Sequence, residues 1–461
     1  MKTPGEFKNQ NYYCVSILIA FCFFWGGSGF LVWSAQLSKF FNSDTVLLIT
    51  ECFGYLVQFI GVILYALTIR YNPKFAFSRV VLPVFGIIFF LLLLLSTFFN
   101  SLLITLFSGF LTNLICGYVQ GLYLTYLTCL VPQTHRGTSF AFAYALGAIG
   151  TYLASSLFSG GLNSYGMISV IGIVISWTII LNYLGFKNEQ SLFPEKISGK
   201  VRELSYFRKS FLPMCLLVFV FNLLYKTSFY ASELIYISGA LRVEFVRAFS
   251  AIGLIIAGIV NDLDRKYGLI CCLLSLLFPF LCLTLINIPN AATILCILCF
   301  ILLSFIMVYR AISISDLAGK DLRLLPFAGM GLGIGRLGES LGTLVGYQLR
   351  SHQVALIAVL SVLFILAVFI AFHVYQKFYS PTVSEDEKED KALVAFENKY
   401  DLSLREKEVF RLIVSGKSNA ELADSLFVSE STIKFHIGHI LKKTSCLNRS
   451  QLIKKYRTDS Q

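Results

Sequence analysis

The chain has 461 residues, of which 56% are hydrophobic, 15% aromatic and only 14% charged. Soluble globular domains carry about 25% charged residues, so this composition excludes an ordinary soluble protein and is typical of a polytopic membrane protein. The formal net charge is +12 at pH 7, but cytoplasmic loops of membrane proteins supply positive charge too, so it does not by itself indicate nucleic-acid binding.

Long apolar runs dominate residues 1–380. About 20 apolar residues span the roughly 30 Å hydrocarbon core of a bilayer. Twelve runs of this kind lie at 13–36, 45–69, 79–99, 102–131, 138–160, 164–185, 211–238, 243–261, 268–288, 291–315, 326–349 and 353–377. The longest polar interval, 186–210, follows the sixth run and contains six Lys and Arg. The pattern predicts an all-α membrane domain: six helices, a basic loop and six more helices.

Neither the N-terminus nor the cysteines indicate processing or a metal centre. The first apolar run is too long for a signal peptide and lacks a convincing cleavage site. Cys296 and Cys299 form a CxxC pair, but they lie inside an apolar run with no further ligands nearby in the sequence. We interpret the thiols as small apolar side chains and expect no cofactor.

Lys and Arg placement predicts the orientation. If the N-terminus is cytoplasmic, the inner segments hold 17 Lys and Arg and the outer segments hold 3. The inner side of a membrane protein carries the excess of these residues. Twelve spans return the chain to the same side, so we expect both termini in the cytoplasm and the protein in the inner (cytoplasmic) membrane.

Two loops carry more specific patterns. "GIVNDLDRKYG" (258–268) follows the eighth span, and "VPQTHRGTSFAFAYALGAIG" (131–150) enters the fifth. With the six-plus-six layout, these segments resemble the major facilitator superfamily. The matching loop after the second span, "LTIRYNPKFAFSR", lacks the motif's Asp. The resemblance implies the superfamily fold over 1–380 and does not by itself imply transport.

Charged side chains inside apolar spans are costly and mark functional sites. The candidates for ligand sensing are Glu244, Arg247, Arg310, Arg336 and Glu339. Two interpretations stay open. Glu244 with Arg247, and Arg336 with Glu339, are one helical turn apart and could simply neutralise each other. Alternatively, the charges form a central site, in which the two arginines Arg310 and Arg336 suit an anionic or polar ligand.

The polar side chains of the first half are less specific. Gln58, Tyr118, Gln120 and Tyr123 could line the first-half wall of such a site. Trp25 and Trp33 are expected to face lipid or to pack between helices.

The composition changes after residue 380. Residues 381–395 contain an acidic run and are predicted to be a solvated linker. Residues 396–461 show helical apolar spacing with caps. Ser403 to Glu406 and Ser418 to Glu421 are capping boxes, and Gly416 suits a left-handed cap. We expect Leu404, Val409, Leu412 and Ile413 to form one apolar face, and Ile433, Ile437, Ile440 and Leu441 another.

The segment around "VSESTIKFHIGHILKK" (428–443) reads as the second helix of a helix-turn-helix, which enters the major groove of DNA. Residues 402–453 resemble the LuxR/GerE-type DNA-binding domain over their whole length. The resemblance implies a small four-helix domain that binds double-stranded promoter DNA as a homodimer. One departure is Gly438, where the family often has a long polar side chain. A helical protein-interaction module is the alternative for this domain.

The resemblance also implies roles for individual residues. The expected DNA contacts are Thr432, Lys434, Phe435, His436, Lys442 and Lys443, with Lys434 and Phe435 facing base edges. The expected dimer contacts are Leu452, Ile453 and Tyr456.

We found no sequence motif of a catalytic site and therefore expect no enzyme. The sequence favours a membrane-bound one-component transcriptional regulator, whose membrane domain senses an unknown small molecule and whose tail binds a promoter. The alternative is an active transporter with a fused regulatory domain. Uptake by the membrane domain alone would separate the two.

The orientation can be tested with reporter fusions. We expect a fusion at residue 380 to report the cytoplasm and a fusion near Ser101 to report the exterior, because of the 17-to-3 distribution of Lys and Arg. An exterior signal at residue 380 would contradict both the orientation and a DNA-binding role for the tail.

Overall fold

The structure is a computed structural model. It describes residues 11–158, 163–185, 211–231, 249–277, 291–320, 322–349, 351–379, 393–426 and 428–459. These residues form α, 3-10 and π helices and no strand. The chain divides into two compact units, Met1–Tyr379 and Ser380–Gln461. The predicted basic loop 186–210, most of the predicted linker 381–395, and the candidate residues Glu244 and Arg247 lie outside the described residues.

The first half of the membrane unit is built from long apolar helices. They are α1 (Asn11–Leu37), α2 (Ser43–Leu48), η1 (Ile49–Phe53), α3 (Gly54–Tyr71), α4 (Pro73–Ala76), α5 (Val81–Phe98), α6 (Leu102–Leu130), η2 (Gln133–His135), α7 (Arg136–Phe158) and α8 (Asn163–Gly185). The second predicted span is one helical path in which η1 is a π-helical turn. Such turns often occur at functional sites.

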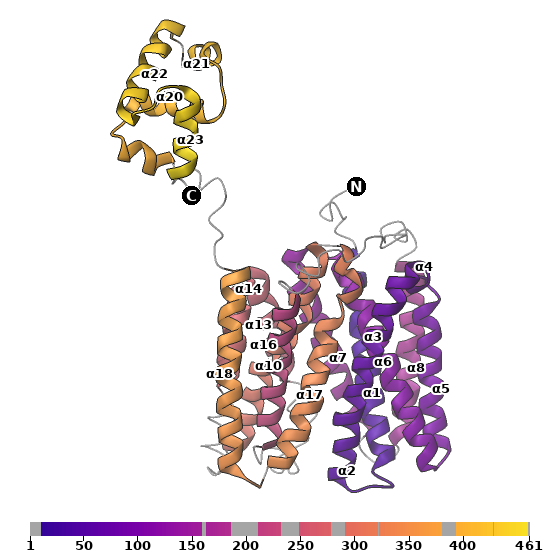
Figure 1. Cartoon of the computed structure of the whole chain (residues 1–461). Helices are drawn as coiled ribbons and strands as arrows, with labels where there is room; N and C mark the ends of the chain where they lie inside the picture. Colours follow the sequence, from indigo (N-terminus) through magenta and orange to yellow (C-terminus); the bar gives the residue numbers. More distant parts are fainter. Residues whose placement is uncertain are drawn as a thin grey trace. The chain divides into compact units, whose positions relative to one another are not determined.

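The second half contains the remaining membrane helices. They are α10 (Leu212–Ala231), α13 (Ser250–Leu263), α14 (Arg265–Ser275), α16 (Ala291–Lys320), η6 (Leu322–Phe327), α17 (Met330–Leu349) and α18 (Gln353–Phe378). In Figure 1 these pink-to-orange helices stand beside the indigo-to-purple helices of the first half, with their axes roughly parallel. Contacts between the halves include α13 against α7 and α17 against α3.

Eight of the described helices are long and apolar enough to cross a membrane. The runs predicted at 211–238, 243–261, 268–288 and 326–349 are not among them. The first three include residues outside the described ranges. In the fourth, glycines and charged residues lower the hydropathy, and the α-helix begins only at Met330, after the 3-10 turn η6. The described residues therefore establish a polytopic helical bundle without fixing its number of spans at twelve.

Glycines allow the membrane helices to approach closely. A Cβ at Gly117 of α6 would lie 1.9 Å from the carbonyl oxygen of Gln58 in α3, and one at Gly338 of α17 would lie 2.7 Å from that of Phe219 in α10. Membrane helices associate through such small residues because lipid offers no hydrophobic gain for packing them. The glycine-rich sequence of α17 is thus explained by its packing against α10.

The second unit is a small helical domain with its own core. Residues 393–399 are helical, followed by α20 (Leu404–Val414), α21 (Asn419–Leu426), α22 (Glu430–Thr444) and α23 (Arg449–Asp459). The core residues are Phe396, Leu402, Val409, Phe410, Ile413, Leu422, Ala423, Ile433, Ile440, Cys446, Leu452 and Tyr456. The predicted linker is therefore shorter than 381–395, because its last residues already belong to a helix.

The predicted helix ends are confirmed. Ser403 and Glu406 form a complete capping box, and Ser418 and Glu421 bond reciprocally in the same way. Gly416 has a φ of +87°, the left-handed conformation that glycine adopts without strain. The prediction for Leu404 was wrong, because it is 84% exposed at the first turn of α20. Ile433 and Ile440 are fully buried, as predicted.

The pKa of Glu406 gives this domain a pH dependence. Burial raises the pKa of this carboxyl, but hydrogen bonds from Lys443 and the Ser403 N–H outweigh burial and leave the pKa below its usual range. A lowered carboxyl pKa stabilises the fold above the unfolded value, about 4.3, and this contribution is lost as pH falls through the lower folded value.

We therefore expect Glu406→Gln to destabilise residues 393–461 by about 1–2 kcal/mol at pH 7 and by less near pH 3. Thermal unfolding followed by circular dichroism at both pH values measures the difference. Glu408→Gln is the matched control, since Glu408 lies on the same helix and pairs with Arg405 at the surface. An equal loss for Glu406→Gln at both pH values would contradict the assignment.

Candidate DNA-binding surface and membrane cavity

α22 presents an exposed polar and aromatic face. Ser429 caps the helix by accepting from the N–H of Thr432. Lys434 and Lys442 are exposed, and the ring of Phe435 is 62% exposed. His439 lies one turn after Phe435, with its ring centroid 4.4 Å from that of the phenyl ring. A helix-turn-helix reads DNA with such a face, and an exposed phenyl ring has no role in the domain's own core.

Two of the predicted DNA-contacting residues, His436 and Lys443, are not free on the exposed face of α22. His436 is half-buried. Lys443 donates to the carboxylate of Glu406 and to the carbonyl of Asp401, both at 2.7 Å. Because its ammonium stabilises the junction between α22 and the capping box of α20, we leave Lys443 out of the proposed DNA surface. His439 was missed, although its i, i+4 spacing from Phe435 could have indicated it.

The predicted dimer contacts need correction. Leu452 is fully buried and Tyr456 is 5% exposed, and both pack inside the domain's own core. Tyr456 contacts the rings of Phe396 and Phe410 edge-on. The family resemblance implied that these residues contact a second chain, but in this structure Leu452 and Tyr456 pack within one chain. Ile453 is partly buried against the same core.

A cavity of about 240 Å³ lies between the two halves of the membrane unit. Its walls come from α1, α3, α6 and α7 of the first half and α10, α16 and α17 of the second. The polar residues lining it include Gln58, Gln120, Tyr123, Lys226, Arg336 and Glu339. Of the predicted first-half wall, Gln58, Gln120 and Tyr123 line the cavity, whereas Tyr118 packs beside Tyr65.

Glu339 is shared by the two arginines predicted from the sequence. Its Oε1 accepts from Arg310 at 2.5 Å and its Oε2 from Arg336 at 2.7 Å. Arg310 also donates to Asn222 of α10 at 2.7 Å. The pairing of Arg336 with Glu339 was expected as a possible self-neutralising pair. The structure adds Arg310, so the carboxylate is held by two cations.

A second ion pair joins the two halves of the membrane unit beside the cavity. Lys226 of α10 pairs with Glu51 of η1 at 2.8 Å. The guanidinium of Arg336 lies 4.5 Å from the ring centroid of Tyr55 in α3, a cation–π distance. In the first half, Gln58 donates to Asn113 at 2.7 Å and accepts from Gln120 at 3.2 Å. The polar groups of the cavity are therefore held in place by neighbours on several helices.

Arg310 reaches Glu339 because α17 has a glycine opposite it. A Cβ at Gly335 would lie 2.9 Å from the Cδ and Nη1 atoms of Arg310. The glycine therefore leaves the room that the arginine side chain occupies. Arg310 itself is 1% exposed and sits behind the cavity wall.

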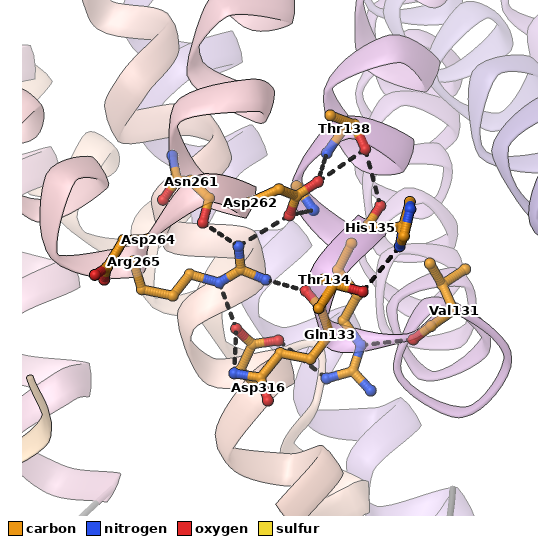
Figure 2. Close-up of polar contacts among 12 residues, drawn as sticks. Val131, Gln133, Thr134, His135, Thr138, Asn261, Asp262, Asp264, Arg265 and Asp316 are labelled. Atoms are coloured by element: carbon orange, nitrogen blue, oxygen red, sulfur yellow. Dashed lines mark hydrogen bonds and ion pairs between the residues drawn. The ribbon is translucent and has the colours of Figure 1, made fainter. Parts of the chain in front are cut away.

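The two loops singled out in the sequence meet in a network of charged residues, which Figure 2 shows. Asp262 of α13 accepts from the N–H groups of Gly137 and Thr138 at 2.8 and 2.7 Å. Its charge thus lies at the N-terminus of α7, where the helix dipole stabilises an anion. Asp316 of α16 pairs with Arg136 at 3.0 Å and with Arg265 at 2.6 Å.

This network links helices from both halves. Arg136 belongs to α7 of the first half, whereas Arg265 and Asp316 belong to α14 and α16 of the second. Arg136 also donates to the carbonyls of Thr128 and Val131 at the end of α6. The two sequence patterns, 131–150 and 258–268, contain Arg136, Asp262 and Arg265, whereas Asp316 lies outside both.

The comparisons with known proteins concern each unit separately. Residues 401–456 match the family described as "Bacterial regulatory proteins, luxR family". Spore germination protein GerE of Bacillus subtilis is 41% identical over 58 residues, which are 13% of this chain and 78% of that protein. The chain belongs to the LuxR family. It does so through its C-terminal domain, so the DNA-binding fold expected from "VSESTIKFHIGHILKK" is confirmed.

Longer relatives match over segments of similar length. The uncharacterized transcriptional regulatory protein YhcZ of Bacillus subtilis is 46% identical over 55 residues, which are 12% of this chain and 26% of that protein. The CsgBAC operon transcriptional regulatory protein of Escherichia coli is 44% identical over 52 residues, 11% of this chain and 24% of that protein. The chain thus spans about a quarter of these relatives' length.

The membrane unit resembles solved transporters in fold. The similarity to the major facilitator superfamily transporter FucP in its outward conformation extends over 77% of this chain and 98% of the FucP chain. The TM-score is 0.56 and the sequence identity is 14%. The similarity to the human organic anion transporter MFSD10 extends over 78% of this chain and 99% of the MFSD10 chain, with the same TM-score and sequence identity. This LuxR-family chain therefore combines a DNA-binding domain with a membrane unit of the major facilitator superfamily fold.

The exposed face of α22 leads to a DNA-binding prediction. We expect Lys434→Ala in residues 393–461 to weaken binding to a specific duplex by about 1–3 kcal/mol and to relax preference at one base pair. Electrophoretic mobility shifts on the preferred duplex and its single-base variants measure both effects. Lys407→Ala on α20 also removes one positive charge, but outside α22, so it should weaken DNA binding less than Lys434→Ala does. An equal loss on all duplexes would make Lys434 a phosphate contact.

Proposed function

We propose that the protein is a membrane-bound transcriptional regulator, in which a small molecule bound in the membrane cavity controls promoter DNA binding by the C-terminal domain. The observation that carries the proposal is the pairing of two features in one chain. A LuxR-type domain with an exposed α22 follows a membrane unit whose cavity is lined by buried charges.

The charges that line the cavity, together with Glu51, which pairs with Lys226, support ligand sensing. The side chains of Lys226, Glu51 and Glu339 are each less than 10% exposed, and that of Arg336 is 18% exposed. A buried ion pair is often no more stable than an apolar pair of the same volume. A bundle that only anchored a DNA-binding domain would therefore gain nothing from this cluster, whereas a ligand site needs it.

The output domain is proposed to act at a promoter in the cytoplasm. Lys434, Phe435 and Lys442 are the residues we expect to contact double-stranded DNA, with Thr432 and His436 near the helix start and the phosphates. Two domains are expected to pair on DNA as a homodimer. Because Leu452 and Tyr456 are buried, exposed positions of α23 such as Gln451 and Lys454 are the better candidates for that contact.

Ligand binding is proposed to control DNA binding by shifting the populations of two conformations of the membrane unit. The membrane unit would exist in two conformations, and a ligand shifts their ratio only if it binds one more tightly. A preference of about 100-fold corresponds to about 2.7 kcal/mol of bias. Such a bias would change how often two DNA-binding domains of neighbouring chains can pair on a promoter.

An active transporter with a fused regulator is the second candidate. The ion pairs that join the halves favour it, because Lys226–Glu51 and Arg136–Asp316 would have to break and re-form if the halves move about the cavity. Proton-coupled uptake by Met1–Tyr379 in proteoliposomes would support transport. Absence of uptake together with a responsive promoter would support sensing alone.

The regulator hypothesis predicts the behaviour of cavity variants. We expect Arg336→Ala and Arg310→Ala to hold promoter output at one level across growth conditions that change the output of the parent, because both remove a cation from Glu339. A reporter fused to a promoter recovered by chromatin immunoprecipitation measures this. Lys377→Ala, on the exposed end of α18, is the matched control. Responses like the parent's from both variants, at equal protein abundance, would refute sensing through this cluster.

A further inference from the structure

The charges around the cavity do not balance among the described residues. Three cations, Lys226, Arg310 and Arg336, share two carboxylates, Glu51 and Glu339. Glu339 serves both arginines, and Glu51 serves the lysine. The described part of this cluster thus holds more cationic than anionic side chains, and a buried cationic wall within a membrane unit suits a ligand with a negative charge.

Arg336 is the cation best placed to meet that ligand. Arg310 is 1% exposed and lies behind Glu339, whereas Arg336 lines the cavity with Lys226. One nitrogen of Arg336 donates to Glu339, and one face lies over Tyr55. Its Nε has no hydrogen-bond partner among the described residues. A guanidinium binds carboxylates through two parallel hydrogen bonds, so the Nε side of Arg336 can donate to the carboxylate of a ligand.

Other lining residues also have unfilled hydrogen-bonding capacity. Gln120 Oε1 and the Tyr123 hydroxyl are buried without a partner in the described part of the chain. Most buried polar atoms in proteins are hydrogen-bonded. Four such atoms lie on residues of one cavity, counting Arg336 Nε and Trp25 Nε1, and they indicate a site that a ligand or bound water completes.

The rest of the cavity wall is aromatic. Phe23 stacks on Tyr144 with ring centroids 4.1 Å apart, and Phe23 also lies 5.5 Å from Tyr123. Phe30 and Trp25 complete this side of the wall. The volume of about 240 Å³ is at the small end for ligand pockets, which are roughly 300–1,000 Å³. The wall therefore suits a small ligand with an apolar body.

We propose that the cavity binds a small organic monoanion, whose carboxylate pairs with Arg336 beside Tyr55 and whose apolar body contacts the rings of Phe23 and Tyr144. This rests on the proposed function, for which it names the class of sensed molecule. A carboxylate at Arg336 also approaches Lys226, because both cations lie over the ring of Tyr55. The ligand then competes with Glu51 for the lysine that joins the two halves.

The test uses the full-length chain in lipid nanodiscs and probes that differ only in charge. Phenylacetate, neutral phenylacetamide and cationic phenethylamine share a ring, and hexanoate with hexanamide forms an aliphatic pair. Calorimetry measures binding to the parent. We expect at least one carboxylate to bind about tenfold or more tightly than its amide, and phenethylamine not to bind. Equal or tighter binding of the amides or the amine, or no binding by either carboxylate, would overturn the proposal.

Variants locate the binding. Arg336→Gln should weaken carboxylate binding about tenfold or more while leaving amide binding unchanged. The carboxylate affinity of Arg336→Lys should lie between those of Arg336→Gln and the parent, because lysine keeps the positive charge but lacks the planar guanidinium that donates two parallel hydrogen bonds. Lys377→Gln removes one charge elsewhere in the unit and should bind like the parent. Thermal unfolding of each variant checks that the bundle is intact. Parent-like binding by a folded Arg336→Gln chain would refute the site.

Promoter-DNA occupancy in the same preparation separates this proposal from the regulator hypothesis. If a carboxylate binds through Arg336 and DNA occupancy does not change, the ligand class stands and the regulatory role fails. If DNA occupancy responds to an amide or the amine and not to the carboxylates, regulation stands and the monoanion proposal fails.

Discussion

The carboxylate of Asp316 joins the two halves of the membrane unit. It accepts from Arg136 of the first half and from Arg265 of the second, and its side chain is only 8% exposed. Removing one partner of a buried charge leaves the other charge uncompensated. The halves cannot separate at this point without breaking the pair between Arg136 and Asp316.

The same principle recurs at two other places in the chain. Glu339 is held between Arg310 and Arg336, and Glu406 of the DNA-binding domain accepts from Lys443 and from the Ser403 N–H. In each case one carboxylate is bonded by groups from two or more elements. Because hydrogen bonds depend on distance and angle, the arrangement fixes how those elements meet.

Local patterns in the sequence predicted the elements well, and they failed where distant residues decide the outcome. Capping boxes, Gly416 and the apolar positions of α22 depend on neighbours within four residues, so spacing alone located them. Leu404 matched the helical period but lies in the first turn, where α20 has no neighbour to bury it. The buried side of α23 packs against Phe396, which is far away in the chain, so neither the spacing nor the family resemblance, which implied a contact with a second chain, predicted that burial. Charged residues within spans were recognised by their cost, but their partners, such as Arg136 and Asp316, lie 180 residues apart.

Three contacts lie within a short stretch of α16. Arg310 reaches the cavity carboxylate, and Asp316 belongs to the network between the halves. Tyr309 shares a hydrogen bond with Tyr379, 3.1 Å away, at the last described residue before the DNA-binding unit. The helix is continuous from Ala291 to Lys320, and successive residues turn by about 100° around its axis. Because Tyr309 and Arg310 are adjacent in this helix, a rotation of α16 that moved Arg310 would also move the Tyr309 hydroxyl and change its hydrogen bond to Tyr379.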